Sequence, residues 1–252
     1  LEHPASMSAM KKWAKNTQRN HIIVEHNNDS GSVDEQAYIK KLTSDVRVVS
    51  IVHTSPVTGM TVDLEKITKE VRNVTPDCII IVDGIQHSSH GAIDVQKYDI
   101  DGYVVSPYKM FSRHGYGVAW ASDRLCTLNK EQLADGPFQN WELGTRDAGS
   151  YATFSDVVDY LDWLGSNFTE SENTRERLEA SSIAIKSHEQ ELVDLVINGA
   201  EDIVGLRNNK KIQIIGTSDS KFREGVVSFF QKNKPSSIIV EELSLIHISE
   251  PT

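Results

Sequence analysis

The run Cys78-Ile-Ile-Ile-Val82 is the feature that most restricts how this chain can fold. An unbroken apolar run rich in β-branched residues favours a strand that is covered on both faces, as in a parallel sheet. Apolar runs at Val46–His53, Tyr103–Val105 and Val118–Ala121 repeat the pattern, with helical segments between them. We therefore predict an α/β fold with a mostly parallel sheet and helices on both faces.

The spacing of apolar residues predicts further elements around these strands. In the first half they are helices at Ser6–Thr17, Val33–Leu42 and Val62–Val71 and a strand at His21–Glu25. In the second half they are an irregular stretch at Asn129–Asn140, a helix capped by Ser155 that closes at Gly165, a long helix at Glu172–Gly199, strands at Lys211–Ile215 and Val226–Phe230, and a short element near Ile238. We predict a larger, partial sheet domain over residues 1–150, and connecting helices with a smaller, partial C-terminal α+β domain over residues 151–243.

Both ends of the chain are unusual for a native protein. Leu1 lies inside what already reads as a motif, so we expect an internal fragment that is truncated at both ends. The last residues, SLIHISEPT at 244–252, resemble translated sequencing-adapter read-through. We expect this tail to be non-native.

Charge and cysteine content exclude several classes of protein. The formal net charge of −10 argues against nucleic acid or an anionic membrane as a partner, and no apolar run is long enough to span a bilayer. Cys78 and Cys126 are the only cysteines, too few for a disulfide framework. A reducing, cytoplasmic location is therefore expected.

Polar residues follow three of the predicted strands. They are His53 to Gly59 after the first strand, Asp83, Gln86, His87 and His90 after the second, and Ser106 and Lys109 after the third. Ligands of open parallel sheets bind at the carboxyl ends of the strands, so these side chains are expected at one rim. A lysine, a carboxylate and hydroxyls at one rim suit pyridoxal phosphate, which needs a Schiff base to lysine and an acidic partner for its ring nitrogen.

Four motifs carry a resemblance to a known family. They are IVDGIQHSSHGAIDVQKYDIDGYVVSPYKMF at residues 81–111, Leu1-Glu-His-Pro-Ala5, the strand and loop at Val48–Gly59, and Trp141-Glu-Leu-Gly-Thr145. In order and spacing they resemble the class V aminotransferase and cysteine desulfurase family over roughly residues 1–200. The resemblance implies the type I pyridoxal-phosphate fold, normally a homodimer with a shared active site, and an enzyme that acts on an amino acid.

The resemblance also implies a role for individual residues. Lys109 matches the lysine that forms the Schiff base, Asp83 the carboxylate at the pyridine nitrogen, Gln86 the amide near the ring hydroxyl, His3 the imidazole stacked on the ring, Ser106 a phosphate ligand, and Thr145 the threonine that reaches the phosphate of the other subunit's cofactor. Catalytic roles fall to Lys109, His3 and Asp83.

The chain departs from the family pattern at several places. Ser55-Pro56 stands where members commonly carry Ser-Asn, and Tyr108 replaces a histidine that often precedes the lysine in desulfurases. The glycine-rich phosphate loop, the nucleophilic cysteine and the substrate-binding arginine are expected outside residues 1–243. The reaction therefore stays open between transamination, desulfuration and epimerisation, with a selenocysteine lyase-type enzyme or a non-catalytic relative as further alternatives.

Other readings of the polar motifs are weaker. His87 and His90 could suggest a metal site, but no carboxylate or cysteine set completes it in the sequence, so loop histidines are favoured. The run His188-Glu-Gln-Glu-Leu192 lacks the second histidine of a zinc-protease helix and is interpreted as a solvated helix face. A nucleotide-binding module is disfavoured because neither of the usual glycine-rich phosphate motifs follows a strand.

Overall fold

The computed structural model describes residues 2–138, 140–141, 143–145 and 147–249. Its regular elements are α1 (Pro4–Asn16), α2 (Glu35–Ile39), β1 (Val48–Val52), α3 (Leu64–Val74), β2 (Ile79–Asp83), β3 (Gly102–Val105), β4 (Val118–Ala121), α4 (Asp123–Cys126), α5 (Ala148–Gly165), α6 (Thr174–Asn198), β5 (Gly199–Ala200), β6 (Ile203–Val204), β7 (Ile212–Ile214), β8 (Phe229–Gln231) and α7 (Ser236–Ser249). Short 3-10 turns follow two strands, η1 (His87–Ser89) after β2 and η2 (Pro107–Met110) after β3.

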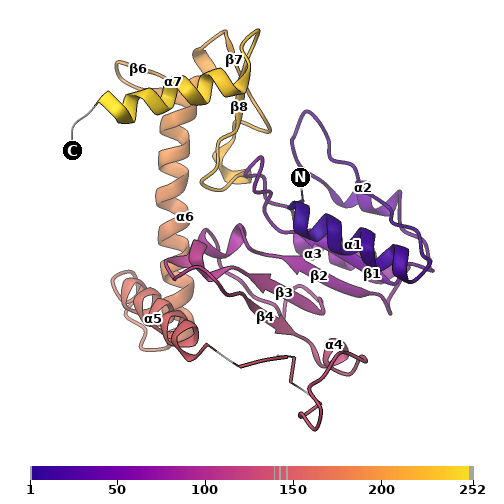
Figure 1. Ribbon diagram of the computed structural model, residues 1–252. Helices are drawn as coiled ribbons and strands as arrows, with labels where there is room; N and C mark the ends of the chain where they lie inside the picture. Colours follow the sequence, from indigo (N-terminus) through magenta and orange to yellow (C-terminus); the bar gives the residue numbers. More distant parts are fainter. Residues whose placement is uncertain (1, 139, 142, 146, 250–252) are drawn as a thin grey trace.

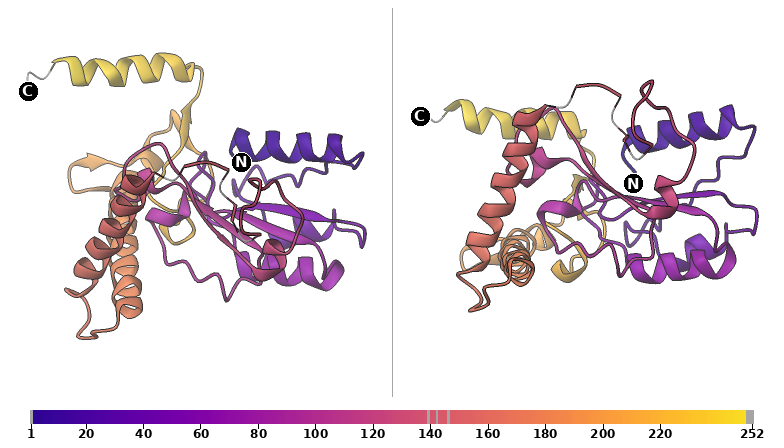
Figure 2. Two further views of the ribbon diagram at one scale, coloured as in Figure 1. Left: turned by 60° about the horizontal axis from the view of Figure 1, so that its bottom comes forward. Right: turned by 90° about the horizontal axis from the view of Figure 1, so that it is seen from below.

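The main sheet has the strand order β1-β2-β3-β4. β1, β2 and β3 are parallel, and β4 closes the edge in the antiparallel sense. Helices α1 and α3 lie on opposite faces of this sheet, as Figures 1 and 2 show. The predicted α/β architecture, with a mostly parallel sheet covered on both faces, is therefore confirmed.

The hydrophobic core lies mainly between the sheet and α3. Ile51 of β1 and Ile80 of β2 are completely buried, as are Ile67 and Val71 on one face of α3. Their spacing of four residues places Ile67 and Val71 on the same side of the helix. Burying each such side chain stabilises the fold by about 1.5–3 kcal/mol, so β1, β2 and α3 form a rigid base.

The register of the parallel strands decides where the polar residues emerge. Val52 pairs with Asp83, and Asp83 pairs with Val104. The chain therefore leaves β1, β2 and β3 at one edge of the sheet. This edge, which we call the rim, carries the segments that begin at His53, Gly84 and Ser106.

The second half of the chain forms a helical pair and a small β unit. Helices α5 and α6 approach so closely that a Cβ at Gly165 would lie 1.9 Å from the carbonyl oxygen of Arg177. Helix α6 leads to the unit that contains β7, β8 and α7 (Figure 1). The fully buried guanidinium of Arg223 ties this unit to the rim, because it donates both to Thr217 within the unit and to the Thr58 carbonyl of the loop after β1.

Two predicted features are wrong in detail. The segment His21–Glu25 forms no strand, because no described strand pairs with its backbone. Ser155 lies inside α5 rather than at its start: the helix begins at Ala148, where the Asp147 side chain accepts hydrogen bonds from the backbone of the first turn. The predicted division at residue 150 falls within this helix and stays a prediction.

The remaining predicted elements are found with shifted ends. Helix α2 is shorter than predicted, and the element near Ile238 is the longer helix α7, which runs through the described part of the predicted tail. Leu1 and residues 250–252 lie outside the described residues. Within the described part of the chain, every helix is too short or too polar to cross a lipid bilayer.

A buried carboxylate, that of Asp101, lies at the edge of the sheet where β3 begins, away from the rim. Asp101, whose side chain is 1% exposed, accepts from Arg72 at 2.8 Å and from the Ile80 backbone at 2.9 Å. Ser122 and Arg124 contact its other oxygen. This carboxylate therefore joins α3, β2 and the residues after β4.

We expect Asp101→Asn to lower the free energy of unfolding by about 3 kcal/mol, because it leaves buried donors and a guanidinium without their charged partner. Asp99→Asn is the matched control, since Asp99 contacts the same arginine, but its side chain is 66% exposed. Asn also tolerates the positive φ of Asp99. The control should lose less than about 1 kcal/mol. Equal losses in urea denaturation of the two variants would contradict the structural role of Asp101.

Candidate active site

Asp83 ends β2 and lies buried at the rim. Ser6 on α1 donates to its Oδ2 atom at 2.9 Å, and the backbone N–H of Ile85 donates to Oδ1 at 3.1 Å. A carboxylate has about four lone-pair positions, so these two contacts leave acceptor capacity. Asp83 is therefore a preorganised acceptor that can receive a further donor.

A second carboxyl group lies near Asp83. Glu2 accepts a hydrogen bond from the backbone N–H of Val52 at 3.1 Å, while its other oxygen is buried and has no hydrogen-bond partner among the described residues. Burial raises the pKa of Glu2, and the nearby charge of Asp83 raises it further. Glu2 therefore retains its proton to higher pH than an exposed glutamate does.

Lys109 is placed by the turn that follows β3. Ser106 is the N-cap of η2, Pro107 begins the turn with a fixed φ, and Lys109 lies in its last part. The half-buried ammonium donates to Oε1 of Gln86 at 2.7 Å. Two predicted site residues from neighbouring strand ends, Gln86 and Lys109, are thus in direct contact.

Gln86 is held in turn by a histidine. Its Nε2 atom lies 3.0 Å from Nε2 of His90, and the Nδ1 atom of His90 lies 2.6 and 2.7 Å from the two carboxylate oxygens of Glu189 on α6. The predicted solvated face at 188–192 is therefore wrong for Glu189, although His188 is exposed. A contact between residues 99 positions apart leaves no signal in the sequence pattern.

A buried polar layer lies next to this chain of contacts. His53 hydrogen-bonds the hydroxyl of Tyr103 at 2.9 Å, and its ring stacks on His87 with centroids 3.7 Å apart. Nδ1 of His87 lies 2.6 Å from the buried Glu224 of the C-terminal unit. Gly84 is required here, because a Cβ at this position would lie 2.1 Å from the Tyr103 ring. The layer connects β1, β3 and the C-terminal unit.

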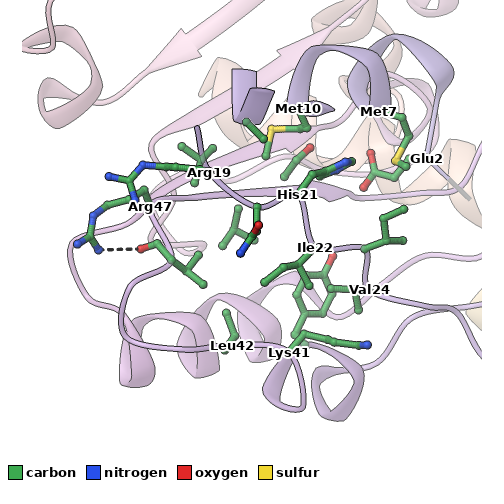
Figure 3. Close-up of a pocket in the computed structure, with 18 of the residues that line it drawn as sticks. Glu2, Met7, Met10, Arg19, His21, Ile22, Val24, Lys41, Leu42 and Arg47 are labelled. Carbon is green, nitrogen blue, oxygen red and sulfur yellow. Dashed lines mark hydrogen bonds between the residues drawn. The ribbon is translucent and has the colours of Figure 1, made fainter. Parts of the chain in front are cut away.

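The cavity in Figure 3 lies beside this site rather than at Lys109. It has a volume of about 380 Å³ and is bounded by α1, the extended segment 18–26 and the edge strand β1. Met7, Met10 and Ile22 give it an apolar lining, while Glu2 contributes a carboxyl group and Arg47 a guanidinium. Ser6, which also lines it, connects it to Asp83. Both segment 18–26 and β1 line the cavity, and they do not pair as strands.

Of the other predicted site residues that the structure describes, Ser106 accepts a hydrogen bond from the backbone N–H of Lys109 at 3.0 Å through its carbonyl, whereas His3 and Thr145 make none to this series of contacts. His3 is exposed and caps α1, with its Nδ1 atom accepting from the Ala5 backbone at 3.1 Å. Ser106 is partly buried at the start of η2, and Thr145 is exposed on the segment before α5. Glu142 of the same motif lies outside the described residues. Their predicted roles toward a cofactor remain predictions.

The chain matches a known protein family over almost its whole length. The model of the family described as aminotransferase class-V matches residues 1–248. A probable cysteine desulfurase of Mycoplasma genitalium is 28% identical over 124 residues, which are 49% of this chain and 30% of that protein. The aminotransferase-like protein FGM3 of Gibberella zeae is 26% identical over 220 residues, covering 85% of this chain and 50% of that protein. The chain thus spans half or less of these relatives.

Solved structures with the same fold include an apo cysteine desulfurase from Thermococcus onnurineus, with a TM-score of 0.74 at 20% identity. The match covers 96% of this chain and 58% of that one. The cysteine desulfurase CsdA from Escherichia coli gives a TM-score of 0.73 at 20% identity, covering 96% and 57%. These likenesses confirm the fold predicted from the sequence.

The buried layer predicts a pH dependence of stability. Burial lowers the pKa of His53 well below 6.5, with further contributions from the charges of His87 and Lys186. Below pH 6.5 the unfolded chain binds a proton at this histidine that the folded chain does not, so stability falls as the pH falls. Between pH 7.5 and 5.5 this single group removes about 1.4 kcal/mol.

We expect His53→Gln to reduce the loss of stability between these two pH values by about that amount, measured by urea denaturation. Tyr103→Phe is the control: it removes the hydroxyl partner and keeps the buried imidazole, so most of the pH dependence should persist. An unchanged pH dependence in His53→Gln would show that His53 is not held neutral by burial.

Proposed function

The chain belongs to the aminotransferase class-V family, and from this membership we propose that the protein is a pyridoxal-phosphate-dependent enzyme that acts on an amino acid. Cysteine desulfuration is the first candidate reaction, because several of the curated relatives are named cysteine desulfurases. Transfer of an amino group is the second, because a match to an aminotransferase-like protein extends over 85% of the chain.

The contact between Lys109 and Gln86, next to a buried carboxylate, carries the proposal. Lys109 and Asp83 come from the ends of neighbouring parallel strands. Asp83 retains acceptor capacity after its contacts with Ser6 and the Ile85 backbone. The ammonium of Lys109 contacts a neutral amide oxygen, which leaves the amine available once it loses a proton. This donor and acceptor set fits pyridoxal phosphate, which needs a lysine amine and an anionic partner for its ring nitrogen.

Each residue would have a separate task. Lys109 would bind the cofactor covalently through Nζ, Asp83 would hold its ring nitrogen protonated, and Gln86 would orient the polar group beside the lysine. Ser106 would bind phosphate, and His3 would lie against the ring. When bound, the cofactor supplies an electron sink for the substrate's α-carbon. Lys109 and His3 are the chain's candidates for moving the proton at that carbon.

We further propose a homodimer in the cytoplasm. Thr145 is exposed on an irregular segment that precedes α5, as expected for a residue that serves a neighbouring subunit. In a two-fold dimer the same surface is used by both copies, so each Thr145 would support the partner's site. Both cysteines are free thiols, which supports a reducing compartment.

The first test locates the covalent attachment. Full-length protein incubated with pyridoxal phosphate and reduced with borohydride should carry the label on Lys109, identified by peptide mass spectrometry. Lys109→Arg keeps the charge and should lose the label. Lys97→Arg is the matched control, because Lys97 is exposed and should leave labelling unchanged. A label on another lysine, or none, would refute the assignment.

The second test concerns the shared site. Lys109→Ala and Thr145→Trp should each be inactive in release of alanine from cysteine, assayed with dithiothreitol as the reductant that takes up the sulfur and frees it as sulfide, or in amino transfer. Mixed after subunit exchange, they should recover about a quarter of wild-type activity, because half of the dimers are mixed and each mixed dimer has one complete site. A fully active monomer, or no recovery despite exchange, would exclude this role of Thr145.

A further inference from the structure

A continuous series of contacts leads from Lys109 to the long helix α6. Lys109 Nζ donates to Gln86 Oε1 at 2.7 Å, and Gln86 Nε2 lies 3.0 Å from His90 Nε2. His90 Nδ1 lies 2.6 Å from Glu189. All four side chains are partly shielded from water, which favours a single arrangement.

The direction of each hydrogen bond follows from the first. An ammonium can only donate, so the amide of Gln86 presents its oxygen to Lys109 and its NH2 group to His90. Nε2 of His90 must therefore accept, which places the ring proton on Nδ1, where it is donated to Glu189. The tautomer of His90 and the orientation of Gln86 are thus set together.

We propose that His90, anchored by Glu189, is a positioning residue that fixes the amide of Gln86 and thereby aims Lys109. The role in aiming rests on the proposed function of Lys109 as the attachment site. Without an acceptor at position 90, the amide of Gln86 can rotate by 180° and present its NH2 group to the lysine. Two donors would then face each other, and Lys109 would lose its fixed direction.

Glu189 also connects this series of contacts to the C-terminal unit. A Cβ at Gly225 would lie 3.3 Å from the carboxyl carbon of Glu189, so this glycine packs against the side chain. Glu189 itself belongs to α6. The direction of Lys109 therefore depends on how α6 and the C-terminal unit dock on the rim.

Protonation of His90 would break the arrangement, because a second ring proton turns Nε2 into a donor. Burial lowers the pKa of His90, but the bond and charge of Glu189, and then the charge of Glu224, outweigh it and raise the pKa, while Lys109 acts in the opposite sense. These three residues supply the charges that face the imidazole. The amide of Gln86 acts against protonation of His90, since its NH2 group donates to the unprotonated Nε2.

The first experiment needs no bound cofactor. The pKa of His90 is measured in cofactor-free, full-length protein from the exchange of its ring C–H, followed by mass spectrometry. Gln86→Leu should raise this pKa, because protonation no longer breaks a hydrogen bond, and Glu189→Gln should lower it, because the carboxylate charge is lost. An unchanged pKa in Gln86→Leu would show that His90 does not hold the amide.

The second experiment measures how fast Lys109 captures pyridoxal phosphate, using borohydride trapping at successive times. His90→Phe and Glu189→Ala should slow capture about fivefold, the effect of losing one hydrogen bond. His90→Gln and Glu189→Gln each restore an acceptor and should recover most of the rate. A purely structural role would not predict this rescue.

Ser88→Ala is the matched control. Ser88 is buried in the same turn, and its hydroxyl donates to the Ile85 carbonyl at 3.1 Å rather than to the C-terminal unit. It should lower thermal stability and leave the capture rate unchanged. Capture at the wild-type rate in both His90→Phe and Glu189→Ala, with folding verified by circular dichroism, would overturn the proposal. If wild-type Lys109 captures no cofactor, the proposed function fails, and the titration of His90 still decides whether His90 holds Gln86.

Discussion

The parallel register of β1, β2 and β3 is the constraint on which the rest of the structure depends. It brings the ends of three strands to one edge, so that Gln86 and Lys109, 23 positions apart in sequence, meet within hydrogen-bond distance. A shift of one residue would turn Asp83 to the opposite face, since side chains alternate along a strand. The completely buried Ile51 and Ile80 oppose such a shift, because it would turn their side chains to the opposite face of the sheet.

Docking of the C-terminal unit is a second constraint, and it rests on buried polar groups. Arg223 is fully buried, and burial lowers its pKa. Its guanidinium is compensated by backbone carbonyls from both sides of the contact, including those of Thr58 and Ile215. The adjacent Glu224 reaches His87 in the same way. Removing any one partner would leave a buried donor or acceptor without a hydrogen bond, which is costly. The two parts of the chain are therefore held in one relative position.

The sequence predicts those parts of the fold that depend on local pattern. The apolar run before Asp83 predicts β2, and the motif that surrounds Lys109 places it beside Gln86, because both follow strand ends. The strand at His21–Glu25 was predicted from the same kind of pattern and does not form, since a strand also needs a neighbour. Ser155 is a good capping residue, yet the helix begins about two turns earlier, with Asp147 as its N-cap. Propensity alone cannot choose between two competent caps.

The partners of the site residues could not be predicted, because they come from distant elements. Ser6 reaches Asp83 across 77 positions, and Glu189 reaches His90 across 99. Ser and Glu are ordinary residues on helix surfaces, so neither carries a sequence signal of its own. Their significance arises only once α1 and α6 are docked. The motif residues therefore specify what the site contains, while the helices that pack around the rim decide how rigidly it is held. A lysine aimed through an amide and an imidazole is sensitive to any change that moves α6, even one far from the rim.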